Sequence, residues 1–384
     1  MSKLEELINK LCPNGVEYKS FGDVVRFING RAYKQEELLQ SGKYKVLRVG
    51  NFFTSDSWYY SDLELENEKY CNKGDLLYAW AASLGPKIWN GDKTIFHYHI
   101  WKLEFDEKVL SKKYLYHFLR FDVDKMYESL THSTMPHVSM GSMQKREIPV
   151  PPLEIQNEIV RILDNFTELE EELEEELVAR RKQYEYYRDS LLSFDDSVEW
   201  KKLGDIATRI KGTPITATQM KLIAADNGEI KIFAGGKTVV NAHESDIPNA
   251  NITKVPAVLV QSRGTIDFVY YDKPFTFKNE MWAYTFENQI TVKYIYYVLK
   301  NNVEHFRKIT ESMGAFPQIA LPDTEKYKVP LPDIKAQEKI VNILDRFEAL
   351  CNDITSGLPA EIEARHKQYE YYRDKLLTFK RKSA

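Results

Sequence analysis

The chain has 384 residues, of which 43% are hydrophobic and 29% are charged, and its formal net charge at pH 7 is −4. This length predicts two or three units with cores of their own, and no apolar stretch reaches the ~18 residues that a membrane-spanning helix needs. The three cysteines, Cys12, Cys71 and Cys351, are too scattered for a disulfide framework or a cysteine-based zinc site. The N-terminal segment has the pattern of a helix rather than of a signal peptide, so we expect a cytoplasmic protein.

The negative net charge does not exclude a nucleic-acid partner, because it comes largely from one segment. Residues 168–176 contain seven glutamates in nine positions, within a stretch that has helical periodicity. Without this segment the flanking regions are closer to neutral or basic, and a basic surface is what phosphate binding normally requires. Net charge therefore leaves the class of partner open.

The first part of the chain predicts a short helix followed by a globular domain. Residues 1–15 are expected to form a capping helix, and a first globular domain is expected at 16–151. β-Branched and aromatic runs predict strands, and a 3.6-residue period predicts a helix. The expected strands lie at 44–49, 75–80 and 98–103, and the expected helix at 112–120. This pattern indicates a mixed α/β domain with a curved sheet.

Two loops of this first domain combine small residues with hydrogen-bond donors. Residues 81–87 follow the second expected strand, and residues 133–137 follow the expected helix. Small residues let a backbone approach a ligand closely, while Ser, Lys and Arg donate to phosphates and base edges. An ordinary surface turn would have a similar composition, but equivalent loops recur in the second half of the chain, which favours a binding role.

Residues 152–197 predict one long helix. Its apolar seam steps by three or four positions from Ile155 to Leu191, and Pro151-Pro152 marks its start. At 1.5 Å per residue, about 38 residues give a rod of roughly 55–60 Å. We expect seam tyrosines to pack between helices, whereas Tyr186 and Tyr371 point away from the seam and are candidate contacts for a protein partner.

The second half of the chain repeats the first. The octapeptide Lys-Gln-Tyr-Glu-Tyr-Tyr-Arg-Asp occurs identically at 182–189 and 367–374. A second globular domain is expected at 198–331 and a distal long helix at 332–384, with a break near 356–359, where Gly and Pro interrupt the helical pattern. In the second domain we expect strands at 258–261 and 281–286, a helix at 292–301, and loops at 262–265 and 313–318.

Helices this long would each leave an apolar stripe exposed, and the natural partner of each is the other copy. The expected architecture is therefore mixed α+β, with two tandem target recognition domains separated by two long antiparallel helices that form a coiled-coil spacer. The two domains are alike at their edges and different in the middle. This contrast favours two readers of two different targets over an old duplication that drifted. Pairing within one chain or between two chains stays open.

The chain lacks the Asn-Pro-Pro-Tyr and Asp-Pro-Pro-Tyr motifs of amino-methyltransferases, a P-loop and a Gly-x-Ser-x-Gly motif. Asp323, Asp333 and Lys335 resemble a nuclease pattern, but the first repeat lacks it and Asp333 is expected to cap a helix. His97 and His99 would share one face of an expected strand, without an evident third metal ligand. We expect no catalytic, cofactor-binding or metal-binding residues.

The junction between each domain and its helix resembles the specificity subunit of type I restriction-modification enzymes. Residues 148–156 read Ile-Pro-Val-Pro-Pro-Leu-Glu-Ile-Gln, and residues 329–337 read Val-Pro-Leu-Pro-Asp-Ile-Lys-Ala-Gln. Each is followed by Ile-Val-x-Ile-Leu-Asp and a long helix, so the resemblance covers essentially the whole chain.

The resemblance implies a non-catalytic subunit that recognises double-stranded DNA in sequence-specific fashion. Each domain would read one half of a bipartite target, while the helical pair sets the spacing and docks two methyltransferase subunits. Restriction/translocase subunits would join for cleavage, and S-adenosylmethionine, ATP and Mg²⁺ would belong to the partners. The alternative is a structural coiled-coil adaptor that joins two protein partners.

The candidate site residues come from loop and helix chemistry, with Arg the strongest candidate for contacts to guanine. The candidate DNA-binding residues are Arg31, Arg48, Asn51, Ser83, Lys87, Ser133, Thr134, His137, Lys211, Lys237, Gln261, Ser262, Arg263, Thr265 and Gln318. The candidates for the helix pair and for partner docking are Ile159, Leu163, Phe166, Tyr184, Tyr186, Tyr187, Ile340, Leu344, Phe347, Tyr369, Tyr371 and Tyr372.

Overall fold

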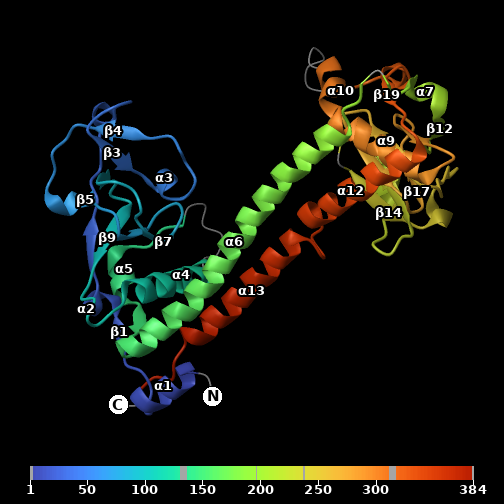
Figure 1. Ribbon diagram of the computed structural model, residues 1–384. Helices are drawn as coiled ribbons and strands as arrows, with labels where there is room; N and C mark the ends of the chain where they lie inside the picture. Colours follow the sequence, from blue (N-terminus) through green and yellow to red (C-terminus); the bar gives the residue numbers. More distant parts are fainter. Residues whose placement is uncertain (1–2, 130–135, 196, 237, 311–316, 383–384) are drawn as a thin grey trace. The chain divides into compact units, whose positions relative to one another are not determined.

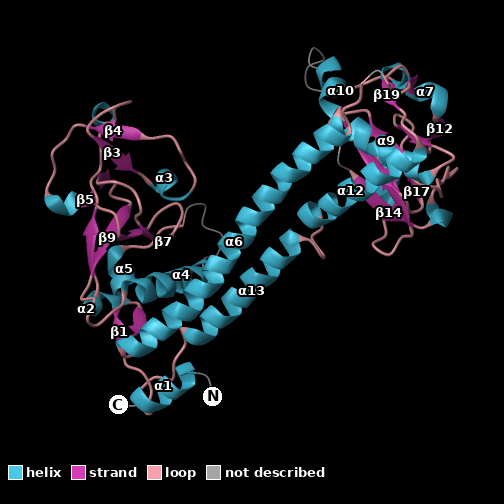
Figure 2. Ribbon diagram, in the orientation of Figure 1, coloured by secondary structure: helices cyan, strands magenta, loops and turns pink. Residues whose placement is uncertain are grey.

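The computed structural model describes residues 3–129, 136–195, 197–236, 238–310 and 317–382. Contacts within the chain define two compact units, one formed by Met1–Glu174 with Ile362–Ala384 and the other by Glu175–Glu361. Each unit contains an α/β domain and one stretch of paired helices (Figures 1 and 2). Mixed α/β domains with long helices are the fold class expected from the sequence.

The α/β domain of the first unit is built on two four-stranded sheets. One sheet has the strand order β2-β9-β6-β7 and the other has the order β4-β3-β8-β5, in which β3 and β8 are parallel. The strands of the first sheet are β2 (Arg26–Asn29), β9 (Ile100–Glu104), β6 (Leu76–Ala79) and β7 (Gly85–Ile88). Those of the second are β4 (Tyr59–Ser61), β3 (Tyr44–Leu47), β8 (Thr94–Phe96) and β5 (Tyr70–Cys71).

Helices and short strands join this domain to the paired helices. The pair β1–β10 carries the chain in and out of the domain, and α4 packs on both β7 and the N-terminal half of α6. The elements are α1 (Lys3–Leu11), β1 (Tyr18–Ser20), α2 (Phe21–Val24), α3 (Val49–Phe53), α4 (Lys112–Ser129), α5 (Met140–Lys145), β10 (Glu147–Pro149) and α6 (Leu153–Leu191).

The second unit repeats this topology with a different sequence. Its sheets have the orders β12-β18-β15-β16 and β14-β13-β17, and β13 and β17 are again parallel. The strands are β11 (Trp200–Lys202), β12 (Thr208–Lys211), β13 (Ile230–Phe233), β14 (Val239–Ala242), β15 (Ala257–Gln261), β16 (Asp267–Tyr271), β17 (Phe275–Phe277), β18 (Trp282–Thr285) and β19 (Lys328–Pro330). The helices are α7 (Leu203–Ile206), α8 (Ala217–Leu222), α9 (Gln289–Asn301), α10 (Val303–Ile309), α11 (Leu321–Glu325), α12 (Ile334–Asn352) and α13 (Leu358–Leu376).

The first long helix is continuous, whereas the second is interrupted. α6 runs for 39 residues after Pro151-Pro152, as the sequence predicts. The distal segment consists of α12 and α13, of 19 residues each, separated at 353–357. The path of the chain through this break requires glycine at position 357, because a Cβ there would lie 2.5 Å from the Ala349 carbonyl oxygen. The predicted interruption is confirmed, and a single unbroken distal helix is not what forms.

The paired helices are antiparallel in each unit, and equivalent aromatic side chains hold them. In the first unit, the rings of Phe166 on α6 and Tyr372 on α13 stack with centroids 5.3 Å apart. In the second unit, Phe347 on α12 and Tyr187 on α6 stack at 5.5 Å. The repeat aligns Phe166 with Phe347 and Tyr187 with Tyr372. Both units therefore use the same Phe–Tyr contact. In the first unit α6 supplies the phenylalanine, and in the second α6 supplies the tyrosine.

The junction between each domain and its helix is also the same in both units. In the first unit, Asp164 on α6 contacts Lys113 at 2.5 Å and the His117 ring nitrogen Nε2 at 2.9 Å. In the second, Asp345 on α12 contacts Lys293 at 2.8 Å and accepts from the Tyr297 hydroxyl at 2.5 Å. One carboxylate thus ties α4 to α6, and its counterpart ties α9 to α12.

The first helix of the chain lies on the N-terminal part of α6. Leu4 is buried in the core of the first unit, and Lys3 donates to the Glu158 carboxylate at 2.8 Å. Further along, Val16 forms a parallel bridge with Arg381, and Tyr18 bonds the backbone of Phe379. Segments from the two ends of the chain therefore contact each other within the first unit.

The buried carboxylate of Glu158 gives this unit a predicted acid sensitivity. Hydrogen bonds from Arg161 and Lys3 lower the pKa of Glu158 from its usual 4.5 to about 2. The ionised form then stabilises the fold at neutral pH, and this contribution is lost as the pH falls from about 4.5 towards 2. We expect Glu158→Gln to lower the free energy of unfolding at pH 7 by about 1–3 kcal/mol.

Urea unfolding of the wild-type chain and of Glu158→Gln at several pH values measures this effect. The variant should lose less stability than the wild type between pH 5 and pH 2, because it has no proton to bind there. Parallel pH profiles for the two proteins would contradict the assignment.

Candidate nucleic-acid interface

The structure brings the two candidate loops of the first domain into contact. Ala81 and His137 form an antiparallel bridge. The backbone N–H of Ala82 donates to the Pro136 carbonyl, and that of Val138 donates to the Trp80 carbonyl, both at 3.0 Å. The loop after β6 and the segment before α5 therefore form one surface.

The second domain has the same loop pair at the equivalent place. Arg263 and Gln318 form the corresponding bridge, and their side chains are joined by a bond of 2.9 Å from Arg263 Nε to Gln318 Oε1. The Gly264 N–H donates to Pro317 at 2.9 Å, and the Ile319 N–H donates to Ser262 at 3.0 Å. The backbone arrangement recurs while the side chains change, which is the arrangement expected of two readers with different targets.

A left-handed backbone position shapes both loops. Ala82 has φ 68° and Gly264 has φ 74°, at equivalent places in the two domains. This region costs a residue with a Cβ atom about 1–2 kcal/mol, and strain of this kind concentrates at functional loops. The first domain therefore holds a strained alanine where the second has an unstrained glycine.

The conformation at Gly264 gives a stability prediction. We expect Gly264→Ala to lower the free energy of unfolding by about 1 kcal/mol, because the left-handed conformation disfavours a Cβ atom. The new methyl group itself has room, since its nearest neighbours would be Gly236 atoms at 3.6 Å. Denaturant unfolding measures the change, with Ala82→Gly as the opposite substitution in the first domain. A stabilising Gly264→Ala would contradict this reading of the loop.

Several candidate DNA-binding residues are exposed on or beside these surfaces. Arg263 and Gln318 are exposed in the second domain, together with Thr265 and Lys211. Ser83 and His137 are exposed in the first. Arg48 is half-buried below the first-domain loops, with its guanidinium 4.8 Å from the centre of the Tyr59 ring. Ser133, Thr134 and Lys237 lie outside the described residues.

The structure gives other candidates a role within the fold. Gln261 and Ser262 are buried, and the Ser262 hydroxyl donates to the Glu280 carbonyl at 2.8 Å. Asn51 donates to the carbonyls of Ser55 and Ser57 within a turn. The polar side chains that we expected to contact bases thus have other positions: Gln261 and Ser262 are buried at the end of a central strand, and Asn51 bonds within a turn.

Arg31 and Lys87 are likewise engaged inside the first domain. Arg31 forms two hydrogen bonds with Glu37, at 2.7 and 2.8 Å, and these bonds lower the pKa of Glu37 to about 2. The ammonium group of half-buried Lys87 donates to the Phe52 carbonyl at 2.6 Å. Both side chains therefore hold parts of the first domain together.

A hollow lies beside the loop pair in each domain, and sequence analysis missed both. In the first domain it has a volume of about 520 Å³, and in the second about 420 Å³. The first hollow is lined by Asn29, Ala32, Trp80, Tyr98, Trp101, Val138, Ser139 and Met140. The second is lined by Arg209, Ile210, Lys211, Gly212, Asn279, Glu280, Met281, Trp282 and Leu321. Met140 lines the first hollow and Leu321 lines the second, and the repeat aligns these two residues, which was the signal in the sequence that pointed to equivalent positions.

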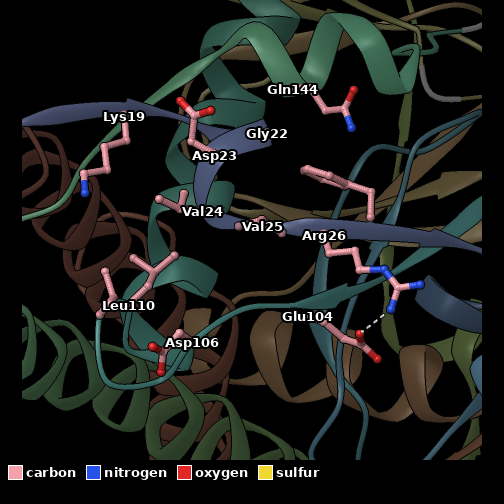
Figure 3. Close-up of a pocket in the computed structure, with 12 residues that line it drawn as sticks. Lys19, Gly22, Asp23, Val24, Val25, Arg26, Glu104, Asp106, Leu110 and Gln144 are labelled. Carbon is pink, nitrogen blue, oxygen red and sulfur yellow. Dashed lines mark hydrogen bonds and ion pairs between the residues drawn. The ribbon is translucent and has the colours of Figure 1, made fainter.

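Another pocket, of about 640 Å³, lies near the start of β2, and the paired loop residues do not line it (Figure 3). Asp23, Glu104 and Asp106 line it together with Lys19 and Arg26, and Arg26 is paired with Glu104 at 3.1 Å and with Glu68 at 2.7 Å. The three carboxylates outnumber the two cations, so this pocket attracts phosphate weakly.

His97 and His99 do not share a strand face, which corrects the expectation from the sequence. They lie in the turn between β8 and β9, with ring centroids 4.8 Å apart. Burial, with smaller contributions from His99 and Arg48, lowers the pKa of His97 to about 4. The described residues contain no group of three or more His, Cys, Asp or Glu side chains that could hold a metal ion.

The helix candidates divide into buried and exposed residues. Ile159, Leu163 and Tyr369 are buried in the core of the first unit, and Ile340 and Leu344 in that of the second, so they fix helices to domains. The ring centroids of Tyr184 and Phe347 lie 6.1 Å apart, between the paired helices. Tyr186 and Tyr371 are 70% and 63% exposed, as expected for residues that face away from the seam.

Among the described residues, no helix combines the length and apolarity that crossing a bilayer requires. One α/β fold repeated with the same paired loops, but with different loop side chains, defines a tandem recognition protein. A family model described as the type I restriction modification DNA specificity domain matches residues 13–179 and 196–364. The chain belongs to the family of type I restriction-modification specificity subunits.

Individual relatives and solved structures agree with this family. The chain is 39% identical over 298 residues to the specificity subunit of the type I restriction enzyme EcoR124I/EcoR124II from Escherichia coli, covering 71% of this chain and 72% of that protein. It is 32% identical over 318 residues to a putative type I specificity subunit from Haemophilus influenzae, covering 76% and 78%. A crystal structure of a type I S subunit from M. genitalium has the same fold, with TM-score 0.58 and 17% identity over 94% of this chain and 96% of that one.

Proposed function

We propose that this specificity subunit reads a bipartite double-stranded DNA target, with each α/β domain reading one half. The observation that carries the proposal is the loop pair that recurs in both domains with one backbone geometry and different side chains. Phosphate contacts position such a domain on DNA, and contacts to base edges give its sequence preference. The paired helices would set the spacing between the two half-sites.

The helices also support a proposal about partners. The Tyr186 and Tyr187 rings on α6 pack edge to face, as do those of Tyr371 and Tyr372 on α13. Each pair belongs to a copy of the identical octapeptide, although the rest of the two halves has diverged. Two identical surfaces suit two copies of one partner, which we take to be methyltransferase subunits.

Exposed apolar residues on α12 extend the proposed docking surface in the second unit. Ile343 and Leu350 are exposed and lie on one helix face with Phe347, and Ile354 is exposed in the turn that follows α12. Aromatic residues surrounded by apolar neighbours are typical of the centres of protein interfaces. Restriction/translocase subunits would join the resulting assembly.

We further propose that this chain carries out no chemistry of its own and acts in the cytoplasm. The sequence lacks the catalytic motifs of methyltransferases and P-loop ATPases. S-adenosylmethionine, ATP and Mg²⁺ would then bind to partner subunits. Methylation or cleavage of DNA by the purified chain alone would contradict this proposal.

Binding of the complex with the methyltransferase subunit to a library of random duplexes tests the proposed function. We expect enrichment of one sequence with two specific parts separated by a fixed gap. Exchange of residues 16–151 for the corresponding domain of a relative should change one part only. Enrichment of no sequence would exclude a reader and favour the structural adaptor, for which DNA affinity should also lack a steep dependence on salt.

A further inference from the structure

The hollow of the first domain adjoins the loop pair directly. Trp80 immediately precedes the bridged residue Ala81, and Val138 immediately follows its partner His137. Both Trp80 and Val138 line the hollow, together with Tyr98, Trp101 and Met140. A DNA base edge placed against the loops would therefore meet an apolar wall.

Stacking and hydrogen bonds hold this wall in place. The ring of Trp80 stacks on Trp101, and Trp101 stacks on Tyr78, with centroids 5.8 Å apart and interplanar angles of 18° and 15°. The indole N–H of Trp80 donates to the Tyr98 carbonyl at 2.7 Å. A rigid wall loses little entropy when a ligand group packs against it.

Asn29 places one polar group beside the wall, in a fixed orientation. The indole N–H of Trp101 donates to Asn29 Oδ1 at 2.9 Å. An indole N–H can only donate, so the amide oxygen must face Trp101 and the amide NH₂ group must face the other way. Asn29 is exposed, and Nδ2 has no partner within the part of the chain that the structure describes. The hollow thus combines apolar walls with one directed donor.

This combination matches one base edge in the major groove. Thymine presents the O4 acceptor next to its 5-methyl group, whereas cytosine presents an amino donor, adenine an amino donor beside the N7 acceptor, and guanine two acceptors, all three without a methyl group. We propose that the hollow receives the 5-methyl group of a thymine in the half-site read by the first domain, with Asn29 Nδ2 donating to O4. The proposal rests on the proposed function, because it assigns a base contact to the same surface.

The second domain lacks this combination and supplies an internal control. Lys211 occupies the place of Asn29, since Lys211 pairs with Trp282 as Asn29 pairs with Trp101 in the sheet. The indole N–H of Trp282 donates instead to Thr324 Oγ1 at 3.0 Å. Charged Arg209, Lys211 and Glu280 line this hollow, and burial of a methyl group beside them gains little. Only one half-site should therefore respond to removal of a thymine methyl.

Uracil substitution tests the contact, because uracil keeps O4 and lacks only the methyl group. The assay uses the complex of this chain with its methyltransferase subunit and duplexes that carry the enriched target with uracil at one thymine at a time. We expect one thymine of the first half-site to show about a fourfold or greater loss of affinity, as burial of one methyl group predicts. Thymines of the second half-site should change affinity by less than twofold.

Two substitutions then test the residues. Met140→Ala enlarges the hollow and should reduce the uracil effect, whereas Leu321→Ala, at the equivalent place in the second domain, should leave it unchanged. Asn29→Asp keeps an oxygen for Trp101 but replaces the NH₂ group by a second acceptor. Because a carboxylate accepts from the cytosine amino group, this variant should prefer 5-methylcytosine to thymine at the sensitive position.

The outcomes separate this inference from the proposed function. Sequence-specific binding with no uracil-sensitive thymine in the first half-site, or with no thymine there at all, would overturn the inference and leave the proposed function standing. An unchanged base preference in Asn29→Asp would also overturn it. Absence of any sequence-specific binding would overturn both.

Discussion

Arg263→Ala is expected to weaken binding to the cognate duplex by about 10- to 100-fold, which corresponds to about 1–3 kcal/mol for loss of one well-placed contact to guanine. The bond from Arg263 Nε to Gln318 fixes the plane of the guanidinium group. Its two terminal nitrogens can then bond O6 and N7 of one guanine together. Gel shifts with the methyltransferase complex, on the cognate duplex and on duplexes with single base-pair changes, measure both affinity and discrimination.

The controls for Arg263→Ala lie in the same loop pair and in its counterpart. Gln318→Ala should cause a smaller loss, because it frees the guanidinium plane without removing its donors. His137 occupies in the first domain the place that Gln318 occupies in the second, so His137→Ala should change affinity only for duplexes altered in the other half-site. An equal loss on every duplex would identify Arg263 as a phosphate contact, and it would contradict base reading.

Combined replacement of Tyr186 and Tyr371 by alanine is expected to weaken the binding of both methyltransferase subunits by about 30-fold each. Each ring is largely exposed, so its loss should leave the fold intact, whereas an aromatic residue at the centre of an interface contributes about 2 kcal/mol or more to binding. Each single variant should bind one partner subunit about 30-fold more weakly and keep the other. Sedimentation velocity with the purified methyltransferase subunit distinguishes assemblies with two, one or no partner subunits.

The matched control is Glu175→Ala, which removes an exposed side chain from the same helix. It should leave the stoichiometry unchanged. A double tyrosine variant that still binds two methyltransferase subunits with wild-type affinity would show that docking uses another surface.

The helices could be predicted from the sequence in detail, because local rules decide them. A proline pair precedes α6, the Asp333 side chain accepts from the Ala336 N–H at the start of α12, and a glycine accompanies the interruption before α13. Each of these signals acts over a few residues. The octapeptide repeat also allowed the antiparallel pairing to be predicted, because each of the two long helices has an apolar seam that becomes buried when the helices pack together.

The candidate site was predicted less well, because burial and turn geometry depend on distant residues. The segment around His97 and His99 has the composition of a strand, but the chain bends there around Gly30. A Cβ atom at Gly30 would lie 2.3 Å from the carbonyl oxygens of Phe96 and His97, so only glycine allows this approach. Gln261 is polar yet buried at 7% exposure, because β15 lies between two neighbouring strands and beneath α9. Neither fact follows from local sequence.

The hollows illustrate the same limit. Asn29 and Trp101 lie far apart in the sequence and become neighbours only through the pairing of β2 with β9. No motif marks Asn29, and its directed amide follows from a single hydrogen bond to an indole. The repeat alone could have shown that equivalent positions differ between the two domains, and that such differences are where specificity is encoded.

The contact of Val16 and Tyr18 with residues 379–381 has a consequence for how such genes can change. The strand that enters the first domain is anchored to the chain end that leaves α13, so the fold does not dictate which domain must be encoded first. An arrangement in which the second domain is encoded first could keep the same set of contacts. Recombination could then exchange or reorder whole recognition halves, and new DNA specificities could arise without any change in the surfaces that hold the assembly together.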